Sequence, residues 1–570
     1  MKHMGRTLTV CLILGVAASL APAQSSAPPA PSAATLQPTT LQVESQIVLL
    51  DVSVTDANGK PVTDLRPDEF RITEQGLPQT IASFAPPTAH AMPTDATGSL
   101  LVNSTADLGK IGQAPVTLIV LDELNTTFAD RAYARTRLIE WLKRQPAVMT
   151  QPTALLAIND KDLHLLRDYT QDRDALLAVL QKHSGDVVWR MDPNSTSAST
   201  HENMGAVLAA IDQLAQATRG IAGRKNLLWA GRGFPAVDIS DVGVSSADSI
   251  NAQLRYLSDL LMQARVTLSV IGPALSASEA NVFNSTLSQG GSQTLADQAQ
   301  TGANMSAFNN GDGVLKFFAL SVASGGHSYS ARNDIDAEIG RSVDEGGTYY
   351  TLSYRPTNAS NDPKAYRKIR VMVTRPGLTV QTRDGYFAQQ QQPVLSAKES
   401  TKQLAFDLNG AAISPLTYTD LHLTVERGSR GNFTLHATAR DLTWHDLPDG
   451  RRHADVVLLA ACLSPRGRLL ARSFATLGSN TEASLASIGI STAALPMHVA
   501  APPGTSRIRF VARDLASGRV GTADITPKVE SAPVYCCRAR SMARTTARAL
   551  LAHSTNSFSG TESATRPAPA

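Results

Sequence analysis

From residue 115 onward, short apolar runs alternate with longer segments of helical spacing. The runs are VTLIVL at 116, ALLAI at 154, NLLWA at 226, VTLSVI at 266, HSYS at 327 and YYTLSY at 349. Continuous apolar runs are typical of strands that are covered on both faces. The intervening helices are predicted at Ala129–Arg144, in VLKFFALSVA at 314, along the stripe Val207, Leu208, Ile211, Leu214 and Ala215, and along the stripe Ile250, Leu254, Leu257 and Leu261. This alternation predicts a doubly wound, mainly parallel α/β sheet, with its binding crevice at the carboxyl ends of the strands.

Two flanking regions have the two-residue period of β-structure instead. Residues 39–85 alternate apolar and polar positions around turn signals at Asn58-Gly59 and at Gly76, which predicts a small β module. Residues 401–527 hold short alternating strands between Gly, Pro and Asp turns, which predicts a β-sandwich of immunoglobulin or fibronectin type. The expected fold class is therefore multidomain, α/β plus β.

Composition shifts mark the boundaries of these regions. At 570 residues the chain is too long for one core. We expect an Ala/Pro/Ser-rich linker at 24–38, a second linker at 86–113, an α/β domain with a C-terminal β extension at 114–388, a Gln-rich linker at 389–400 and a disordered basic tail at 528–570.

The N-terminus has the three-part plan of a secretory signal. Lys2 and Arg6 precede the apolar run LTVCLILGVAASL, and small residues follow at Ala21 and Ala23. We predict a signal peptide at 1–23, cleaved after Ala23, and an exported protein in a periplasm or outside the cell. The apolar run is short for a bilayer span, and no later segment is longer, so the mature chain is expected to have no transmembrane segment.

Charge and cysteine content exclude some functions. The formal net charge is +3, and no Lys/Arg run with interleaved aromatic residues is present, so a nucleic-acid partner is not expected. Cys11 lies in the signal, Cys462 in an apolar run, and Cys536 and Cys537 in the basic tail. This spacing predicts neither a disulfide framework nor a zinc site.

The first strand of the α/β region runs into a cluster of oxygen-bearing side chains. Asp122, Glu123, Asn125 and Thr126 follow VTLIVL directly and precede a predicted helix. Oxygen ligands of this kind suit a hard cation such as Mg²⁺. An alternative needs no metal: Asn125 or Thr126 caps the helix, and Asp122 accepts hydrogen bonds from loop N–H groups.

Catalytic motifs are missing from the sequence. There is no Gly-x-Ser-x-Gly elbow, no His-Glu-x-x-His pair and no phosphate-binding loop that ends in Gly-Lys-Ser/Thr. His164, His183, His201 and His327 occur singly. A hydrolase that uses strand-end carboxylates, with Asp160 or Asp162 from NDKD as contributors, is the alternative to a non-enzymatic protein.

Several motifs together carry a family resemblance. They are VLLDVSVTDANGKPVTDLRPDEFRITEQG, the Asp-x-x-Asn-Thr after the first α/β strand, RKNLLWAGRGFP, ARVTLSVIG, DEGGTYYTLSYRP and YRKIRVMVTRPGLTVQTRDGYFA. Over residues 40–390 the chain resembles the acidobacterial von Willebrand factor A-related family. The resemblance implies an A-type domain: a mainly parallel sheet between helices that acts in adhesion or assembly, often through a divalent cation at the top of the sheet.

The sequence departs from the metal-binding pattern of that superfamily, which takes an Asp-x-Ser-x-Ser loop, a Thr from a second loop and an Asp from a third. Asp122 and Thr126 fit the first loop, but Leu124 stands at the first Ser position. The third loop reads Gly231-Arg232-Gly233, and Thr196 or Thr200 would supply the second loop. The resemblance thus implies a degenerate site of Asp122, Asn125 and Thr126, with weak Mg²⁺ binding at most and no required cofactor.

These expectations combine into one reading. The protein is predicted to be exported and non-enzymatic, and to bind a protein or cell-surface partner through an A-type domain with a degenerate metal site. The alternatives are the hydrolase and a structural envelope component whose A-type domain binds no ligand.

Overall fold

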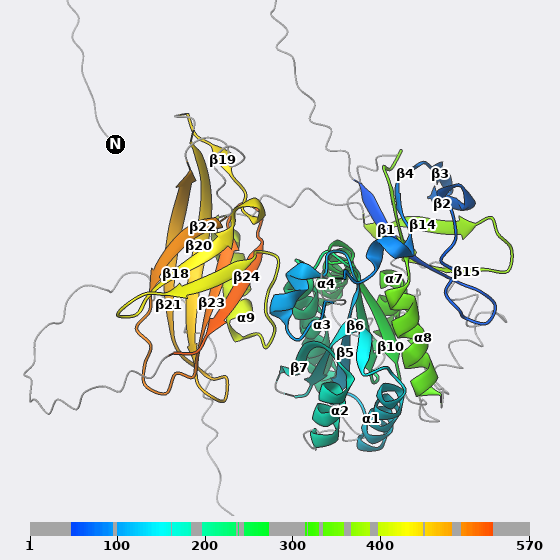
Figure 1. Cartoon of the computed structure of the whole chain (residues 1–570), viewed down its shortest axis with the longest axis horizontal. Coiled ribbons are helices and arrows are strands. Elements are labelled where there is room, and N and C mark those ends of the chain that lie inside the picture. Colours follow the sequence, from blue (N-terminus) through cyan, green and yellow to red (C-terminus); the bar gives the residue numbers. More distant parts are fainter. Residues whose placement is uncertain are drawn as a thin grey trace, which may run out of the picture. The chain divides into compact units, whose positions relative to one another are not determined.

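The computed structural model describes most of the chain (Figure 1). The described residues are 47–94, 100–160, 162–183, 197–234, 237–238, 244–272, 314–315, 317–329, 334–357, 366–387, 397–448, 451–481 and 492–527. Two compact units are distinguished, Met1–Ile47 and Val48–Ala570, and the first lies almost wholly outside the described residues. The predicted signal peptide, the 24–38 linker and the basic tail therefore lie outside them as well.

A six-stranded sheet forms the centre of the α/β region. Its strand order is β12-β10-β8-β5-β6-β7. The bounds are β5 Val116–Asp122, β6 Val148–Ile158, β7 Leu163–Asp172, β8 Lys225–Ala230, β10 Val266–Ile271 and β12 Ser328–Tyr329. Five strands run parallel, and β7 pairs antiparallel with β6 at one edge. The predicted α/β content is confirmed, and the sheet is a mixed one, because the antiparallel strand β7 was not part of the predicted, mainly parallel sheet.

Helices cover both faces of this sheet (Figure 1). Their bounds are α1 Phe128–Lys143, α2 Arg173–Lys182, α3 Ser197–Thr218, α4 Val244–Gln263, α7 Phe317–Ser324 and α8 Ile335–Gly347. Alternate side chains of β5 enter different cores, because successive residues of a strand point to opposite faces. Ile119 and Leu121 pack with α1, α2 and α8. Leu118 and Val120 pack with α3, α4 and α7.

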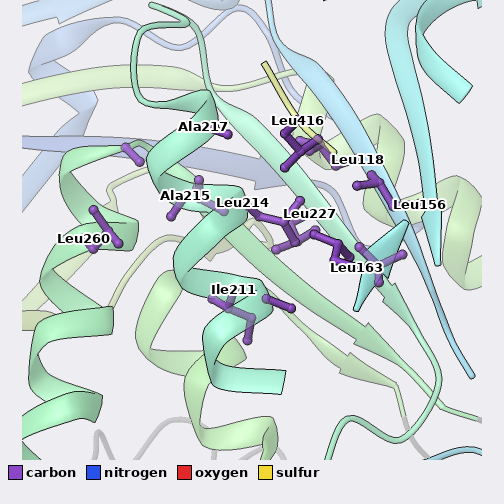
Figure 2. Close-up of a cluster of buried hydrophobic side chains, with 14 of the residues drawn as sticks. Leu118, Leu156, Leu163, Ile211, Leu214, Ala215, Ala217, Leu227, Leu260 and Leu416 are labelled. Atoms are coloured by element: carbon purple, nitrogen blue, oxygen red, sulfur yellow. The ribbon is translucent and has the colours of Figure 1, made fainter. Parts of the chain in front are cut away.

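Figure 2 shows the second of these cores. Ile211 and Leu214 of α3 lie there beside Leu227 of β8 and Leu118 of β5. Each of these side chains is no more than 1% exposed. The stripe predicted on α3 is therefore the face that anchors this helix to the sheet. A short antiparallel pair, β9 Val237–Asp238 with β11 Val314–Leu315, accompanies this region.

The N-terminal β segment and the strands after α8 share two sheets. One has the order β15-β1-β13-β4 and the other β16-β14-β2-β3. The bounds are β1 Val48–Thr55, β2 Phe70–Glu74, β3 Leu77–Gln79, β4 Ile81–Ala85, β13 Tyr350–Tyr354, β14 Tyr366–Val373, β15 Thr379–Gln381 and β16 Gly385–Phe387. The YYTLSY run therefore does not extend the parallel sheet, as its place in the sequence pattern suggested. It pairs with β1 and β4 and helps to bury one shared core.

A second region of antiparallel, sandwich-like sheets lies at the C-terminal end of the described chain. Its sheets have the orders β17-β18-β22 and β19-β20-β23-β24, with β21 paired to β20. The bounds are β17 Leu423–Arg427, β18 Asn432–Thr438, β19 His445–Asp446, β20 Arg452–Leu463, β21 Leu469–Thr481, β22 Thr492–His498, β23 Arg507–Asp514 and β24 Val520–Ile525. A short 3₁₀ turn, Ala439–Asp441, lies between β18 and β19, and others lie earlier in the chain at Pro67–Glu69, Pro87–His90 and Thr105–Lys110.

One helix, α9 Ala397–Ile413, precedes these strands where the sequence reading expected a linker and β-structure. Arg509 of β23, which is 1% exposed, holds the end of α9. Its guanidinium forms an ion pair with Asp524 at 2.7 Å and donates to the carbonyl oxygens of Ser414 and Leu416. A buried arginine thus binds the backbone of the segment that directly follows α9.

Candidate functional site

The Asp122 carboxylate lies at the carboxyl end of β5 and is 1% exposed. Its Oδ1 accepts hydrogen bonds from the backbone N–H groups of Leu124 at 3.1 Å and Asn125 at 2.9 Å. Its Oδ2 accepts from the backbone N–H of Gly233 at 2.7 Å and from the indole N–H of Trp229 at 3.2 Å. The structure therefore shows the predicted loop hydrogen bonds, and both carboxylate oxygens are occupied by protein donors.

These donors act on a carboxylate that has lost its hydration. Burial raises the pKa of Asp122 above its ordinary value, and the four N–H donors oppose that rise without cancelling it. A bound dication would supply the missing positive charge at such a carboxylate. Here backbone dipoles and one indole group supply part of it instead.

The loop after β8 closes over Asp122 from the other side. Gly231 has a φ of +151°, and a Cβ built there would lie 2.3 Å from the Cβ of Asp122. No side chain fits in that space, so an acidic ligand cannot replace Gly231 without moving the loop. The backbone N–H of Arg232 donates to the Thr126 hydroxyl at 3.1 Å. The two loops are thus joined by direct hydrogen bonds.

The remaining candidate ligands are also engaged or directed elsewhere. Leu124, at the position of a metal-binding serine, is 5% exposed and packs into the core. The Asn125 side-chain oxygen accepts from the Asn203 amide of α3 at 3.0 Å. Arg232 forms an ion pair with Asp130 at 2.9 Å and brings a positive charge to the loop. Within the described ranges, no group of three or more His, Cys, Asp or Glu residues could hold a metal ion.

The prediction that Asn125 or Thr126 caps helix α1 was wrong. Helix α1 begins at Phe128, and its N-cap is Thr127, whose hydroxyl accepts from the Asp130 N–H at 3.2 Å. Asn125 and Thr126 lie too early in the chain for this role. Their side chains bridge to α3 and to the loop after β8 instead.

A small pocket adjoins the Asp122 loop at the same edge of the sheet. It encloses about 90 Å³, roughly the room needed for a few water molecules or one small side chain. The lining residues are Leu121, Asp122, Glu123, Phe128, Arg131, Ala132, Ala134, Arg135, His183 and Ala230. The pocket thus joins the ends of β5 and β8 to the start of α1 and the end of α2.

Polar groups of different charge meet in this pocket. His183 Nε2 lies 2.5 Å from the Glu123 carboxylate, which is nearly buried. Arg135 donates from Nε and Nη2 to the carbonyl oxygens of Leu180 and Gln181 at the end of α2. Phe128 stands at the rim and is 68% exposed. The contact between Glu123 and His183 could not be predicted from local sequence patterns, because 60 residues separate them.

The other predicted site residues are not part of this arrangement. Asp162 is exposed and pairs with His164 at 2.7 Å, and His327 pairs with Glu345 at 2.6 Å. Asp160 is exposed in the bend after β6, and Thr196 lies outside the described residues. Thr200 and His201 fall in α3, but their side chains are not described. Ala23, Cys536 and Cys537 lie outside the described residues too, whereas Cys462 is a buried free thiol.

The described residues also bear on membrane attachment. No helix among them is both long enough and apolar enough to cross a bilayer.

Comparisons with known proteins give no family. No protein-family model matches the chain, and no curated protein matches it. Among solved structures, it is similar to the human COPII-coat protein Sec24c, with 8% identity, a TM-score of 0.22 and coverage of 53% of this chain and 48% of that one. The chain thus spans about half the length of that protein.

Two bacterial structures show lower similarity. One is a calcium-binding mutant of β-glucuronidase 2 from Bacteroides uniformis, with 14% identity, a TM-score of 0.11 and coverage of 31% of this chain and 18% of that one. The other is a glycosyl hydrolase family 2 member from Bacteroides cellulosilyticus, with 9% identity, a TM-score of 0.11 and coverage of 84% and 74%. TM-scores this low carry no argument about function.

Proposed function

We propose that this chain is an exported, non-enzymatic interaction protein that binds a protein partner through a von Willebrand A-type domain whose strand-end face works without a metal. The main support is the Asp122 carboxylate, which accepts four hydrogen bonds from within the protein. An A-type face that depends on Mg²⁺ needs carboxylate and hydroxyl oxygens free to coordinate the ion. Here hydrogen bonds already hold the loops in place.

The sheet supports the A-type assignment. A mainly parallel sheet with an antiparallel edge strand lies between two helical layers, and Asp122 ends the strand β5. The loops after β5 and β8 meet over this carboxylate at one edge. Ligands of open α/β sheets bind at the carboxyl ends of the strands. The exposed ring of Phe128 and the adjoining pocket lie at that edge and would contact the partner.

A hydrolase finds less support in the same residues. A general base must be within hydrogen-bonding reach of the proton that it abstracts. Asp122 is buried with both oxygens bonded to protein N–H groups, and Asp162 is paired with His164 at the surface. The pocket is also much smaller than the roughly 300–1,000 Å³ of common small-molecule sites.

The test is a comparison of partner capture by tagged full-length variants from the envelope extract of the cells that make the protein. Wild type, Phe128→Asp and the control Met372→Asp would each be used with EDTA and with Mg²⁺. Met372 is 41% exposed on β14, which belongs to a different sheet from the strand-end loops. We expect wild type and the control to retain the same partner in both buffers, and Phe128→Asp to lose it. Retention only with Mg²⁺, or undiminished retention by Phe128→Asp, would overturn the proposal.

A further inference from the structure

The solvent face of α9 carries large apolar side chains. They are Phe406 and Ile413, seven residues apart on one stripe of the helix. Lys402, four residues before Phe406, lies on the same stripe. Phe406 is 65% exposed and Ile413 is 64% exposed. The opposite stripe is buried and includes Leu408 and Ala411. The exposed apolar residues are therefore not those that attach α9 to the protein.

Strand β21 adds a second aromatic side chain beside this stripe. Phe474 is 57% exposed, and the Arg472 guanidinium lies 6.0 Å from its ring centre. Arg472 also donates to the Asn409 side-chain oxygen at 2.6 Å. Asn409 lies between Phe406 and Ile413 on the helix, so this bond joins the two elements into one surface. We call Lys402, Phe406, Ile413, Arg472 and Phe474 the α9–β21 patch.

The charges at this surface are mostly positive. Arg466 and Arg468, both exposed, lie in the turn that leads into β21 and add to Lys402 and Arg472 of the patch. Two nearby carboxylates whose side chains are described are already paired: Asp407 with Arg513 at 2.8 Å, and Asp524 with Arg509 at 2.7 Å. In the part of the chain that the structure describes, no carboxylate forms an ion pair with any of these four side chains, Lys402, Arg466, Arg468 and Arg472.

We propose that the α9–β21 patch attaches the protein peripherally to an anionic lipid surface. Exposed apolar side chains that gather on one surface and are rimmed by polar residues are typical of interaction sites. Rings and aliphatic chains surrounded by cations suit the boundary between headgroups and acyl chains, where the apolar groups are buried and Lys and Arg attract lipid phosphates. The charge complementarity points to anionic headgroups as the partner. This inference goes beyond the strand-end interaction and does not depend on it.

Vesicle flotation of the full-length protein tests the proposal. We expect wild type to float with vesicles of phosphatidylcholine and phosphatidylglycerol in equal parts, and to float far less with phosphatidylcholine alone. Raising the salt concentration should release it, because screening weakens attraction to anionic lipid. Phe406→Ser combined with Phe474→Ser should lower the partition coefficient at least roughly tenfold, since interfacial binding scales with buried apolar area.

Two further variants separate the patch from general surface effects. Arg472→Glu should weaken binding to the anionic vesicles and shift its salt dependence. Phe128→Ser removes an equally exposed ring on α1 and should bind as wild type does. Failure of wild type to bind anionic vesicles would overturn the proposal and leave a protein partner for this surface. Equal loss in Phe128→Ser and in the patch variants would overturn it as well.

Discussion

Replacing Asp122 by Asn tests how the strand-end loops are held. The amide has nearly the shape of the carboxylate, but it keeps only one acceptor oxygen. Its NH₂ group must then face either the N–H groups of Leu124 and Asn125 or those of Gly233 and Trp229. Two buried donors lose their acceptor in either orientation.

The size of the effect follows from those two donors. Leaving a buried donor without a partner costs about 1–3 kcal/mol, so two such donors cost roughly 2–6 kcal/mol. Removing a buried charge returns part of this, because burial raises the pKa of Asp122 and so disfavours its ionised form. We therefore expect Asp122→Asn to lower the free energy of local unfolding by about 3 kcal/mol at neutral pH.

The raised pKa of Asp122 also determines how its contribution to stability changes with pH. The folded chain binds the Asp122 proton more tightly than the unfolded chain, whose pKa is near 3.8. The contribution of this carboxyl group to stability is therefore complete below that value and is lost as the pH rises through the raised pKa of the folded state. The difference between wild type and Asp122→Asn should accordingly grow as the pH is lowered from neutrality.

Hydrogen exchange followed by mass spectrometry measures these effects segment by segment in the full-length chain. Peptides that cover β5 with its loop and β8 with its loop should lose protection in Asp122→Asn. The matched control is Asp162→Asn, a carboxylate just before β7 that is 63% exposed and forms an ion pair with His164. Its loss should cost less than about 1 kcal/mol. Equal, small changes in both variants would refute the hydrogen-bonded account of the loop.

Three further predictions concern other parts of the fold. Gly231→Ala should destabilise the loop after β8, because its Cβ would lie 2.3 Å from the Cβ of Asp122; exchange protection in the β8 peptide checks this, and wild-type protection would contradict it. Burial lowers the pKa of Lys225 to about 7, whereas its pKa in the unfolded chain is near 10.5. The free energy of unfolding should therefore rise as the pH increases from 7 to 10.5, because the unfolded chain holds the Lys225 proton in that range and the folded chain does not. The stability of Lys225→Met, followed by urea unfolding across this range, should lack that rise. A chain of residues 114–388 should be proteolysed faster than one of 48–388, because β13 and β14 pair with β1 and β2; equal resistance would show that the shared sandwich is not needed.

The central sheet could be predicted because its strands are covered on both faces and read as continuous apolar runs. β7 was missed because it is an edge strand with several half-buried positions, which leaves no such run. YYTLSY was recognised as a strand, but local pattern does not specify a partner, and its partners β1 and β4 lie about 270–300 residues earlier. In α9, Leu404, Leu408, Ala411 and Ala412 have helical spacing in the sequence, so that signal was present and was read as β-structure.

Only the hydrogen bonds between Asp122 and its own loop could be predicted from the sequence. Asp122 and the N–H groups of Leu124 and Asn125 are close in sequence, so their hydrogen bonds follow from the loop itself. The donors from Trp229 and Gly233 depend on the adjacency of β5 and β8, which the sequence suggests only through the α/β pattern. The meeting of Glu123 with His183 depends on where α2 ends, and no residue pattern reports that.

The direct test of the central proposal is a titration of the full-length protein with Mg²⁺ by calorimetry, on wild type and on Asp122→Asn. Because the Asp122 oxygens and the Thr126 hydroxyl already accept hydrogen bonds from protein N–H groups, we expect no saturable binding at micromolar Mg²⁺. Millimolar Mg²⁺ should also raise the melting temperature little, since stabilisation grows only as RT ln(1 + [L]/Kd). Tight binding by wild type that disappears in Asp122→Asn would contradict the proposal and make the strand-end face a metal-dependent one.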